Sequence, residues 1–254
     1  MRIRVLGCYG AEMPGYKTTG FLINDDTLLD AGTVVSVLDI EEQLKINNII
    51  ISHTHLDHIK DIQFLADNVA GKKNGRINLV STHGVLDILR ANVLNNIIWP
   101  DFTTIQSLNG PILKFFPVKG KEESFIGDIA VLPIRVNHTV EASGYIIKDK
   151  SGAVLYTGDT GHTDWIWNAA MKEDNLKAIF AEASFPNSMA ELADISGHLT
   201  AAGLGKELKK LGNKNVPVYV FHMKPQYLDI IEKEIGLLNN KRIKVLKQGD
   251  VIQI

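Results

Sequence analysis

The sequence predicts a mixed α/β fold, with sheet inside and helices outside. Apolar runs of strand length recur along the 254 residues, and helical patterns separate several of them. A hydrophobic share of 45% is enough for a large buried core, and no repeat or Pro-rich linker divides the chain. We therefore expect one domain that covers residues 1–254.

The early strands lie at hairpin spacing, and the later strands alternate with helices. One helix is predicted by the apolar stripe from Ile59 to Val69. A second helix is predicted over 200–211, where leucines repeat at i, i+4 and i+7 behind Thr200, a residue suited to cap the N-terminus. The predicted strands are 3–6, 21–23, 49–51, 77–80, 129–136, 145–147, 154–156, 178–180 and 216–221.

Composition narrows the class of protein further. No apolar run reaches the roughly 18 to 20 residues of a membrane-spanning helix, and the N-terminus does not resemble a signal peptide, so we expect a cytoplasmic protein. The single cysteine, Cys8, cannot form an internal disulfide and is expected in the core. A net charge of -2 argues against a broad basic surface for nucleic acid.

Three of the eight histidines fall within six residues, in the segment SHTHLDH. This segment follows three isoleucines, so its side chains emerge at the carboxyl end of a buried strand. His53 and His55 point the same way in extended backbone and can bind one cation, while Asp57 and His58 can bind a second. Neutral imidazoles and a carboxylate favour zinc, with iron or manganese as alternatives. The other interpretation is a polar loop whose histidines cap a helix.

Three later strands are each followed by a possible metal ligand, namely His138, Asp159 and His222. All three would lie at the same rim as the first histidines. Two metals with four ligands each need about two more nitrogens and one bridging oxygen, which these residues supply. The sequence therefore predicts two divalent ions per chain, although either histidine alone would be an ordinary structural residue.

The HTHLDH motif, together with the ligands after the three later strands, resembles the five metal motifs of the metallo-β-lactamase superfamily. The resemblance spans nearly the whole chain, from LDAG at 29–32 to GDVI at 249–252. It implies an αββα sandwich of the metallo-β-lactamase type, with a dinuclear metal site at the sheet edges. The ligands that it implies are His53, His55 and His138 for one metal, Asp57, His58 and His222 for the other, and Asp159 as the bridge.

Further segments are similar to the class II 3′,5′-cyclic-nucleotide phosphodiesterases. They are NNIIWP at 95–100, YTGDTG at 156–161, SFPN at 184–187, SGHLT at 196–200 and HMKP at 222–225. A bridging Asp159 is unlike the β-lactamases, which tend to use a cysteine there, and His55 differs from the glutamate of the di-iron flavoproteins. The resemblance implies hydrolysis of cAMP or cGMP to nucleoside 5′-monophosphates through attack by a metal-bridging hydroxide.

Two residues are predicted to take part in catalysis. His198, in the segment GHLT, resembles a histidine that serves phosphodiester cleavage in the tRNA 3′-processing endonucleases. An imidazolium that protonates the leaving alkoxide is worth roughly 10²- to 10⁴-fold in rate, so we predict His198 as the general acid. A structural hydrogen bond at a helix start is the alternative for His198. Asp57 is predicted to orient the reacting water or to accept its proton.

Three residues are predicted to contact the substrate. The flat face of Trp99 suits stacking on a purine, although a Trp-Pro corner that fills the core explains it equally well. Ser184 and Asn187 are predicted to line the pocket, with a role in stiffening their loop as the alternative. The expected partner is a small cyclic nucleotide, and the habit of the family favours a homodimer.

The chain departs from the family pattern just after the first metal motif. Asp61 stands where the class usually has a glycine, and Gln63 and Phe64 replace small residues. Asp61 could support a ligand histidine, but a solvated helix residue is the interpretation that we favour. The alternative functions are an RNA-processing endonuclease, a lactonase or thioesterase, and a non-catalytic metal-binding protein. The endonuclease would need a basic arm to hold tRNA, and the sequence has no Lys/Arg-Gly-rich insertion long enough.

Overall fold

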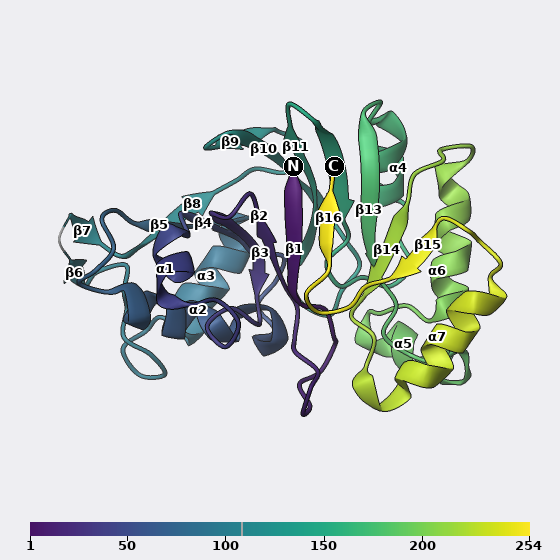
Figure 1. The fold of residues 1–254 in the computed structure, drawn as a ribbon, viewed down its shortest axis with the longest axis horizontal. Coiled ribbons are helices and arrows are strands. Elements are labelled where there is room, and N and C mark those ends of the chain that lie inside the picture. Colours follow the sequence, from purple (N-terminus) through teal and green to yellow (C-terminus); the bar gives the residue numbers. More distant parts are fainter. Residues whose placement is uncertain (108) are drawn as a thin grey trace.

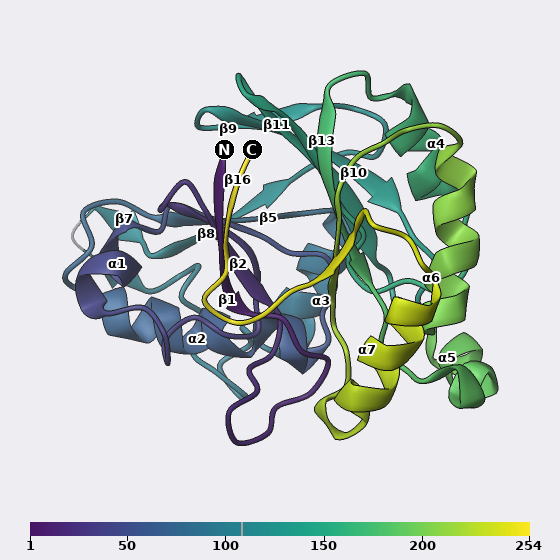
Figure 2. The ribbon, with the colours of Figure 1, turned by 45° about the vertical axis from the view of Figure 1, so that its right-hand side comes forward.

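Figure 1 shows the computed structural model, which describes residues 1–107 and 109–254. Two seven-stranded sheets face each other, with helices α1 to α3 outside the first sheet and α4 to α7 outside the second (Figures 1 and 2). The predicted α/β class and the αββα layering are confirmed. No helix in the described ranges is long and apolar enough to cross a membrane.

The first sheet has the order β16-β1-β2-β3-β4-β5-β8. Its early strands pair antiparallel, whereas β3, β4, β5 and β8 run parallel. The strands are β1 (Arg2–Gly7), β2 (Gly20–Ile23), β3 (Thr27–Ala31), β4 (Asn48–Ile50), β5 (Ile77–Ser81), β8 (Leu113–Pro117) and β16 (Val251–Gln253). The helices of this half are α1 (Ile40–Lys45), α2 (Leu56–Val69) and α3 (His83–Asn92).

The second sheet has the order β15-β14-β13-β12-β11-β10-β9 and is parallel from β12 to β15. The strands are β9 (Ser124–Ile126), β10 (Ile129–Arg135), β11 (Ser143–Asp149), β12 (Gly152–Tyr156), β13 (Leu176–Glu182), β14 (Val218–Phe221) and β15 (Ile243–Val245). The helices are α4 (Trp165–Lys172), α5 (Ala190–Ser196), α6 (Ala201–Leu208) and α7 (Leu228–Leu237). A short pair, β6 (Gln106–Ser107) and β7 (Gly110–Pro111), stands apart from both sheets.

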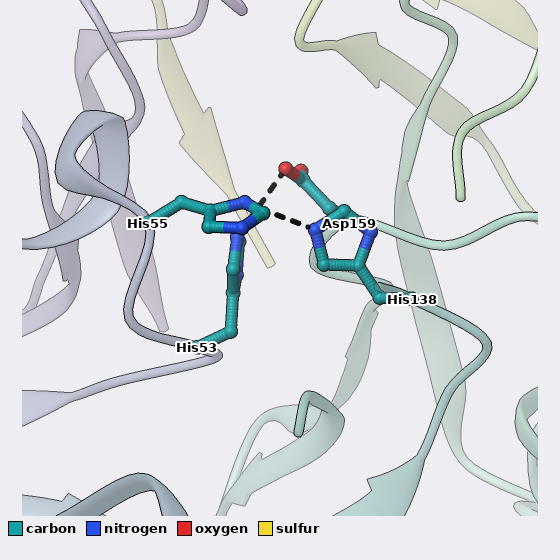
Figure 3. Close-up of side chains that lie close together, drawn as sticks. All are labelled: His53, His55, His138 and Asp159. Carbon is teal, nitrogen blue, oxygen red and sulfur yellow. Dashed lines mark hydrogen bonds and ion pairs between the residues drawn. The ribbon is translucent and has the colours of Figure 1, made fainter. Parts of the chain in front are cut away.

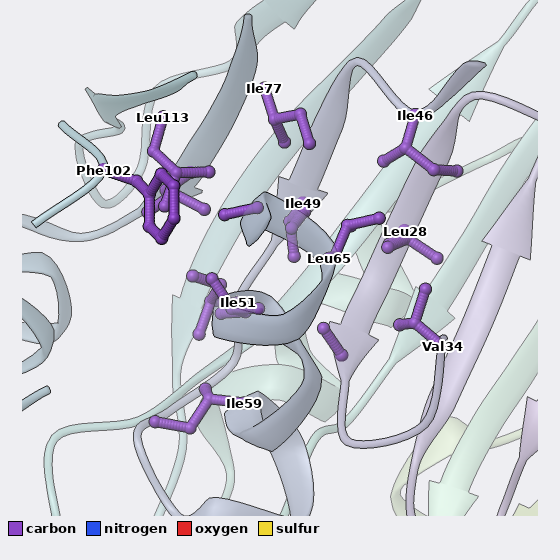
Figure 4. Close-up of a cluster of buried hydrophobic side chains, with 14 of the residues drawn as sticks. Leu28, Val34, Ile46, Ile49, Ile51, Ile59, Leu65, Ile77, Phe102 and Leu113 are labelled. Atoms are coloured by element: carbon purple, nitrogen blue, oxygen red, sulfur yellow. The ribbon is translucent and has the colours of Figure 1, made fainter. Parts of the chain in front are cut away.

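Three layers of buried apolar side chains hold these four layers of elements together. One lies between the first sheet and its helices and includes Ile49, Ile59 and Leu65 (Figure 4). A second lies between the two sheets, and a third lies between the second sheet and its helices. Each buried Ile or Leu contributes about 1.5–3 kcal/mol relative to an exposed position. Each sheet is therefore packed on both of its faces, by the other sheet and by helices, and a site at the common edge of the sheets rests on a rigid support.

Each predicted strand is found, with its ends within two residues of those predicted. The stripe from Ile59 to Val69 is the inner face of α2. The cap predicted at Thr200 is present, because its hydroxyl accepts a hydrogen bond from the Gly203 amide at 3.1 Å. Cys8 is buried in the core between the two sheets, as expected.

Candidate metal centre

The predicted ligands meet at one edge between the two sheets. β4 leads into His53 and His55, and α2 begins directly after them, so that Asp57 and His58 lie in its first turn. Three strands of the second sheet, β10, β12 and β14, lead into the remaining ligands, His138, Asp159 and His222. These seven side chains form two clusters of possible metal ligands that share Asp159.

The first ligand group consists of His53, His55, His138 and Asp159, which point toward one another in Figure 3. Nε2 of His138 lies 3.1 Å from Nδ1 of His55, and Nε2 of His53 lies 3.5 Å from Oδ2 of Asp159. Zinc bonds of about 2.0–2.1 Å at tetrahedral angles place two ligand atoms roughly 3.3 Å apart. The spacings therefore match the edges of one tetrahedral metal shell.

The second ligand group consists of Asp57, His58, His222 and again Asp159. Oδ2 of Asp159 lies 3.1 Å from Nε2 of His58 and 3.3 Å from Nε2 of His222. Nε2 of His222 also lies 3.2 Å from Oδ2 of Asp57. The same oxygen of Asp159 thus faces ring nitrogens of both groups, which is the geometry required of a bridging carboxylate.

Two buried atoms in this centre fit a bound cation. Nε2 of His53 and Oδ1 of Asp159 have no hydrogen-bond partner within the described part of the chain. A buried polar atom without a partner costs free energy, and such atoms are uncommon in folded proteins. Because a divalent cation would satisfy both atoms, the residues present fit the metal ions that the resemblance implies.

The hydrogen bonds behind the rings select the tautomer that a metal requires. His58 Nδ1 donates to Asp30 at 2.8 Å, and His138 Nδ1 donates to the Gly197 carbonyl at 2.9 Å. His222 Nδ1 similarly donates to the Ser184 hydroxyl at 2.9 Å. Each bond leaves the Nε2 lone pair free toward the centre, as partners of metal-ligating histidines usually do. The rings are therefore oriented before any cation is bound.

The charge states of the ligands are also suitable. Burial lowers the pKa values of His53, His55 and His138, which favours the neutral imidazoles that cations bind. Burial alone would raise the pKa values of Asp57 and Asp159, but the neighbouring histidines outweigh it and hold both below the usual range. The first group thus combines neutral nitrogen donors with an ionised carboxylate, a donor set that suits zinc. Burial lowers the pKa of His58 in the second group, but Asp159 and Asp30 outweigh burial and raise it above the ordinary value.

His198 lies against both ligand groups. Its ring stacks on that of His222 with 5.3 Å between centroids, and it meets the ring of His138 edge-on at 5.1 Å. Nδ1 of His198 donates to Oε1 of the fully buried Glu182 at 2.9 Å. Burial lowers the pKa of His198, but Glu182 outweighs burial and raises it above the ordinary value. The structure thus gives His198 a carboxylate partner that favours its protonated form.

The three residues predicted to contact substrate also make contacts within the protein. The Ser184 hydroxyl is buried and donates to Glu182 at 2.7 Å. It also accepts from Nδ1 of His222 at 2.9 Å, so Ser184 supports His222 and the carboxylate that contacts His198. The side-chain oxygen of Asn187 accepts from the backbone amide of Ala202, and the backbone amide of Asn187 donates to the Glu234 carboxylate, each at 2.8 Å. These bonds connect the loop of Asn187 to α6 and α7. Trp99 packs against the first apolar layer, with its ring edge-on to Phe64. The contacts of Asn187 and Trp99 match the structural alternatives that the sequence left open, whereas Ser184 supports Glu182 and His222, and contact with substrate stays a prediction for all three.

The expectation that Asp61 is a solvated helix residue is wrong. Its side chain is only 3% exposed, and Oδ2 accepts hydrogen bonds from the backbone amides of Val34 and Val35 at 2.6 and 3.0 Å. Asp61 therefore fixes the loop after β3. A glycine could not make these bonds, and the sequence alone does not show which loop would face this turn of α2.

Two supporting residues were missed as functional candidates. Asp30 is buried at the end of β3, where it accepts from His58, from Ser52 and from the Tyr156 hydroxyl at 2.6 Å. Glu182 ends β13 in the same way. The signal was present in both cases, because each is an acidic residue that closes an apolar strand at the ligand edge.

Comparisons with known proteins agree with this geometry. Residues 28–223 match a family model described as a β-lactamase superfamily domain. A probable 3′,5′-cyclic-nucleotide phosphodiesterase of Yersinia pestis is 26% identical over 238 residues, which cover 81% of this chain and 67% of that protein. A 3′,5′-cyclic-nucleotide phosphodiesterase of Aliivibrio fischeri is 26% identical over an alignment of 309 residues, which covers 98% of this chain and 91% of that protein. The crystal structure of unliganded yeast PDE1 has the same fold, with a TM-score of 0.83, 20% identity and 98% of both chains covered.

Proposed function

The chain belongs to the metallo-β-lactamase superfamily of hydrolases, and from this premise we propose that it hydrolyses 3′,5′-cyclic nucleotides to nucleoside 5′-monophosphates. Two relatives that carry this activity in their names align with most of the chain. The observation that carries the proposal is the pair His198 and Glu182 beside both ligand groups, since phosphodiester cleavage needs a proton donor for its leaving alkoxide.

Two divalent cations, most simply zinc, would be held by the two ligand groups, with Asp159 between them. When bound, such ions lower the pKa of a shared water and neutralise the phosphate oxygens. The remaining chemistry belongs to the chain. Asp57 keeps a low pKa beside His58 and His222, so it stays ionised and orients the water instead of storing its proton.

His198 supplies the proton that the leaving oxygen needs. Its Nδ1 proton is engaged by Glu182, so the proton available for transfer is the one on Nε2. Glu182 is itself fixed by the Ser184 hydroxyl and by the Thr160 amide at 3.1 Å. The hydrogen bond to Glu182 therefore orients the His198 ring before substrate binds, and Glu182 acts as the positioning residue of His198.

A substrate panel with metal-reconstituted protein tests the function. It contains cyclic AMP, cyclic GMP, a linear aryl phosphodiester, a lactone, a thioester, a β-lactam and a precursor tRNA. We expect turnover of the cyclic nucleotides and of the aryl phosphodiester. Trimming of the tRNA without turnover of cyclic nucleotides would replace the proposal with an RNA-processing nuclease.

The role of His198 is tested by the leaving group. His198→Ala should lower kcat on cyclic nucleotides by roughly 10²- to 10⁴-fold, and far less on an activated aryl diester whose leaving group needs no proton. His83→Ala, which changes an exposed histidine at the start of α3, is the matched control. Equal losses on both substrates would show that His198 positions the phosphate or the fold and is not the acid.

A further inference from the structure

A cavity of about 580 Å³ opens beside the first ligand group. Five of the residues along it carry the argument, and they are Thr82, Arg135, His138, Glu141 and Trp165. The volume falls within the roughly 300–1,000 Å³ that small-molecule sites usually occupy. Because His138 belongs to both the cavity and the ligand group, the cavity begins where the proposed reaction takes place.

Trp165 gives this cavity an aromatic wall. It is the first residue of α4, whose inner face is formed by Ile166, Trp167 and Ala170, so Trp165 points outward and is 51% exposed. An exposed tryptophan at a cavity offers a large flat face for stacking. The guanidinium of Arg135 lies 5.0 Å from the centre of its ring, which sets the two side chains as a pair.

The charges along the cavity favour an uncharged part of the ligand over a phosphate group. Arg135 is positive and Glu141 is negative, and together they leave this part of the lining near neutral. The Glu141 carboxylate accepts from the Thr82 hydroxyl at 2.7 Å and so stays at the wall next to α3. A phosphate would be repelled by Glu141, whereas a base could stack on Trp165 and offer its acceptor atoms to Arg135.

We propose that this cavity binds the nucleobase of the substrate, with Trp165 as the stacking surface and Arg135 as the hydrogen-bond donor. The proposal rests on the proposed function and moves the stacking residue from Trp99 to Trp165. A purine suits the pair best, since an arginine donates well to the N7 and O6 acceptors of guanine. The phosphate then lies at the ligand groups, and His138 joins the two subsites.

The test separates the base from the phosphate. Trp165→Ala should raise KM for cyclic nucleotides about 5- to 150-fold, the range expected for one lost base stack, with little change in kcat. Trp165→Phe should keep part of the affinity, and Arg135→Met should raise KM more for cyclic GMP than for cyclic AMP. For bis(p-nitrophenyl) phosphate, which has no base but whose rings can also stack, kcat should stay within about twofold in all three variants.

Phe64→Ala is the matched control, because it removes an exposed aromatic ring that does not line the cavity and that contacts Trp99. An unchanged KM for cyclic nucleotides in Trp165→Ala, or a rise confined to Phe64→Ala, would overturn the base subsite. Wild type that cleaves the aryl diester but no cyclic nucleotide would refute the proposed function instead. Should Trp165→Ala fail to fold, Trp165→Phe and Arg135→Met decide the question.

Discussion

The two ligand groups differ in how firmly the protein holds them. In the first group, Nε2 of His53 has no partner in the described ranges, and the rings of His53, His55 and His138 contact one another edge-on. In the second group, a buried carboxylate holds His58 and a buried serine holds His222. In the first group, His53 and His138 are held by neutral partners, the Ser52 hydroxyl and the Gly197 carbonyl, whereas the second group contains His58, which is held by the Asp30 carboxylate.

This difference means that changes in supporting residues should affect the groups separately. The Asp30 carboxylate contacts His58 directly and reaches His53 only through the Ser52 hydroxyl, whereas the Asp159 carboxylate faces rings of both groups. The backbone of His222 has a φ of 66°, a left-handed conformation that costs a residue with a side chain about 1–3 kcal/mol. The segment around Cys8 and Gly10 packs against the His222 backbone, so the second group also depends on this N-terminal segment.

The largest effect is expected from Asp159→Ala, because this carboxylate serves both groups. Wild type should bind two ions per chain, and the variant should lose at least one. Metal should raise the melting temperature of wild type, since each ion at 100-fold its Kd adds about 2.7 kcal/mol of stability. Elemental analysis and melting with and without a strong chelator measure both quantities. A wild type that binds one ion or none after careful reconstitution would refute the dinuclear centre.

Asp30→Asn should separate the two groups. The amide keeps the shape of the side chain but loses the charge that holds His58, and loss of such a partner typically weakens metal affinity about 10- to 100-fold. We expect one of the two ions to bind more weakly while the other keeps its affinity, as measured by chelator competition. Equal weakening of both ions would show that the groups are not independently supported.

Gly10→Ala should affect the second group through the backbone. A methyl group at position 10 would lie 2.5 Å from the carbonyl oxygen of His222 and 2.8 Å from its Nδ1, closer than real side chains approach. The His222 amide also donates to the Cys8 carbonyl at 2.7 Å, so His222 cannot move away freely. We expect about tenfold weaker binding of one ion. Gly236→Ala in α7, where the new methyl group contacts nothing within 4 Å, is the control.

Most of the fold could be predicted because its signals are local. Apolar runs of strand length place β1, β5 and β12, and the stripe from Ile59 to Val69 places α2. These patterns also predict helices outside and sheet inside, but the αββα sandwich of two sheets followed from the family resemblance. The candidate ligands could be proposed because His53, His138, Asp159 and His222 each follow an apolar strand, and Asp57 and His58 come just after the first of these residues.

The positions of Asp30 and Glu182 could have been noticed in the sequence, but the partners of the supporting residues could not, because those partners lie in distant segments. Asp61 bonds the backbone at 34 and 35, and Asp30 meets Tyr156 from the other sheet. The same reasoning applies to the aromatic residues. Sequence gives Trp99 and Trp165 equal stacking chemistry, and only the packing shows that Trp99 faces the core while Trp165 faces a cavity.

The smallest effect on either ligand group is expected from Trp99→Ala. Its ring packs on the apolar layer between the first sheet and its helices, so the variant should lose packing contacts and about 1–3 kcal/mol of unfolding free energy, less than a fully buried tryptophan. Both metal affinities and KM for cyclic nucleotides should stay within about twofold, as measured by chelator competition and steady-state kinetics. Urea unfolding of the metal-free protein measures the stability loss. A raised KM with unchanged stability would instead make Trp99 the stacking residue and would connect this half of the molecule to the substrate.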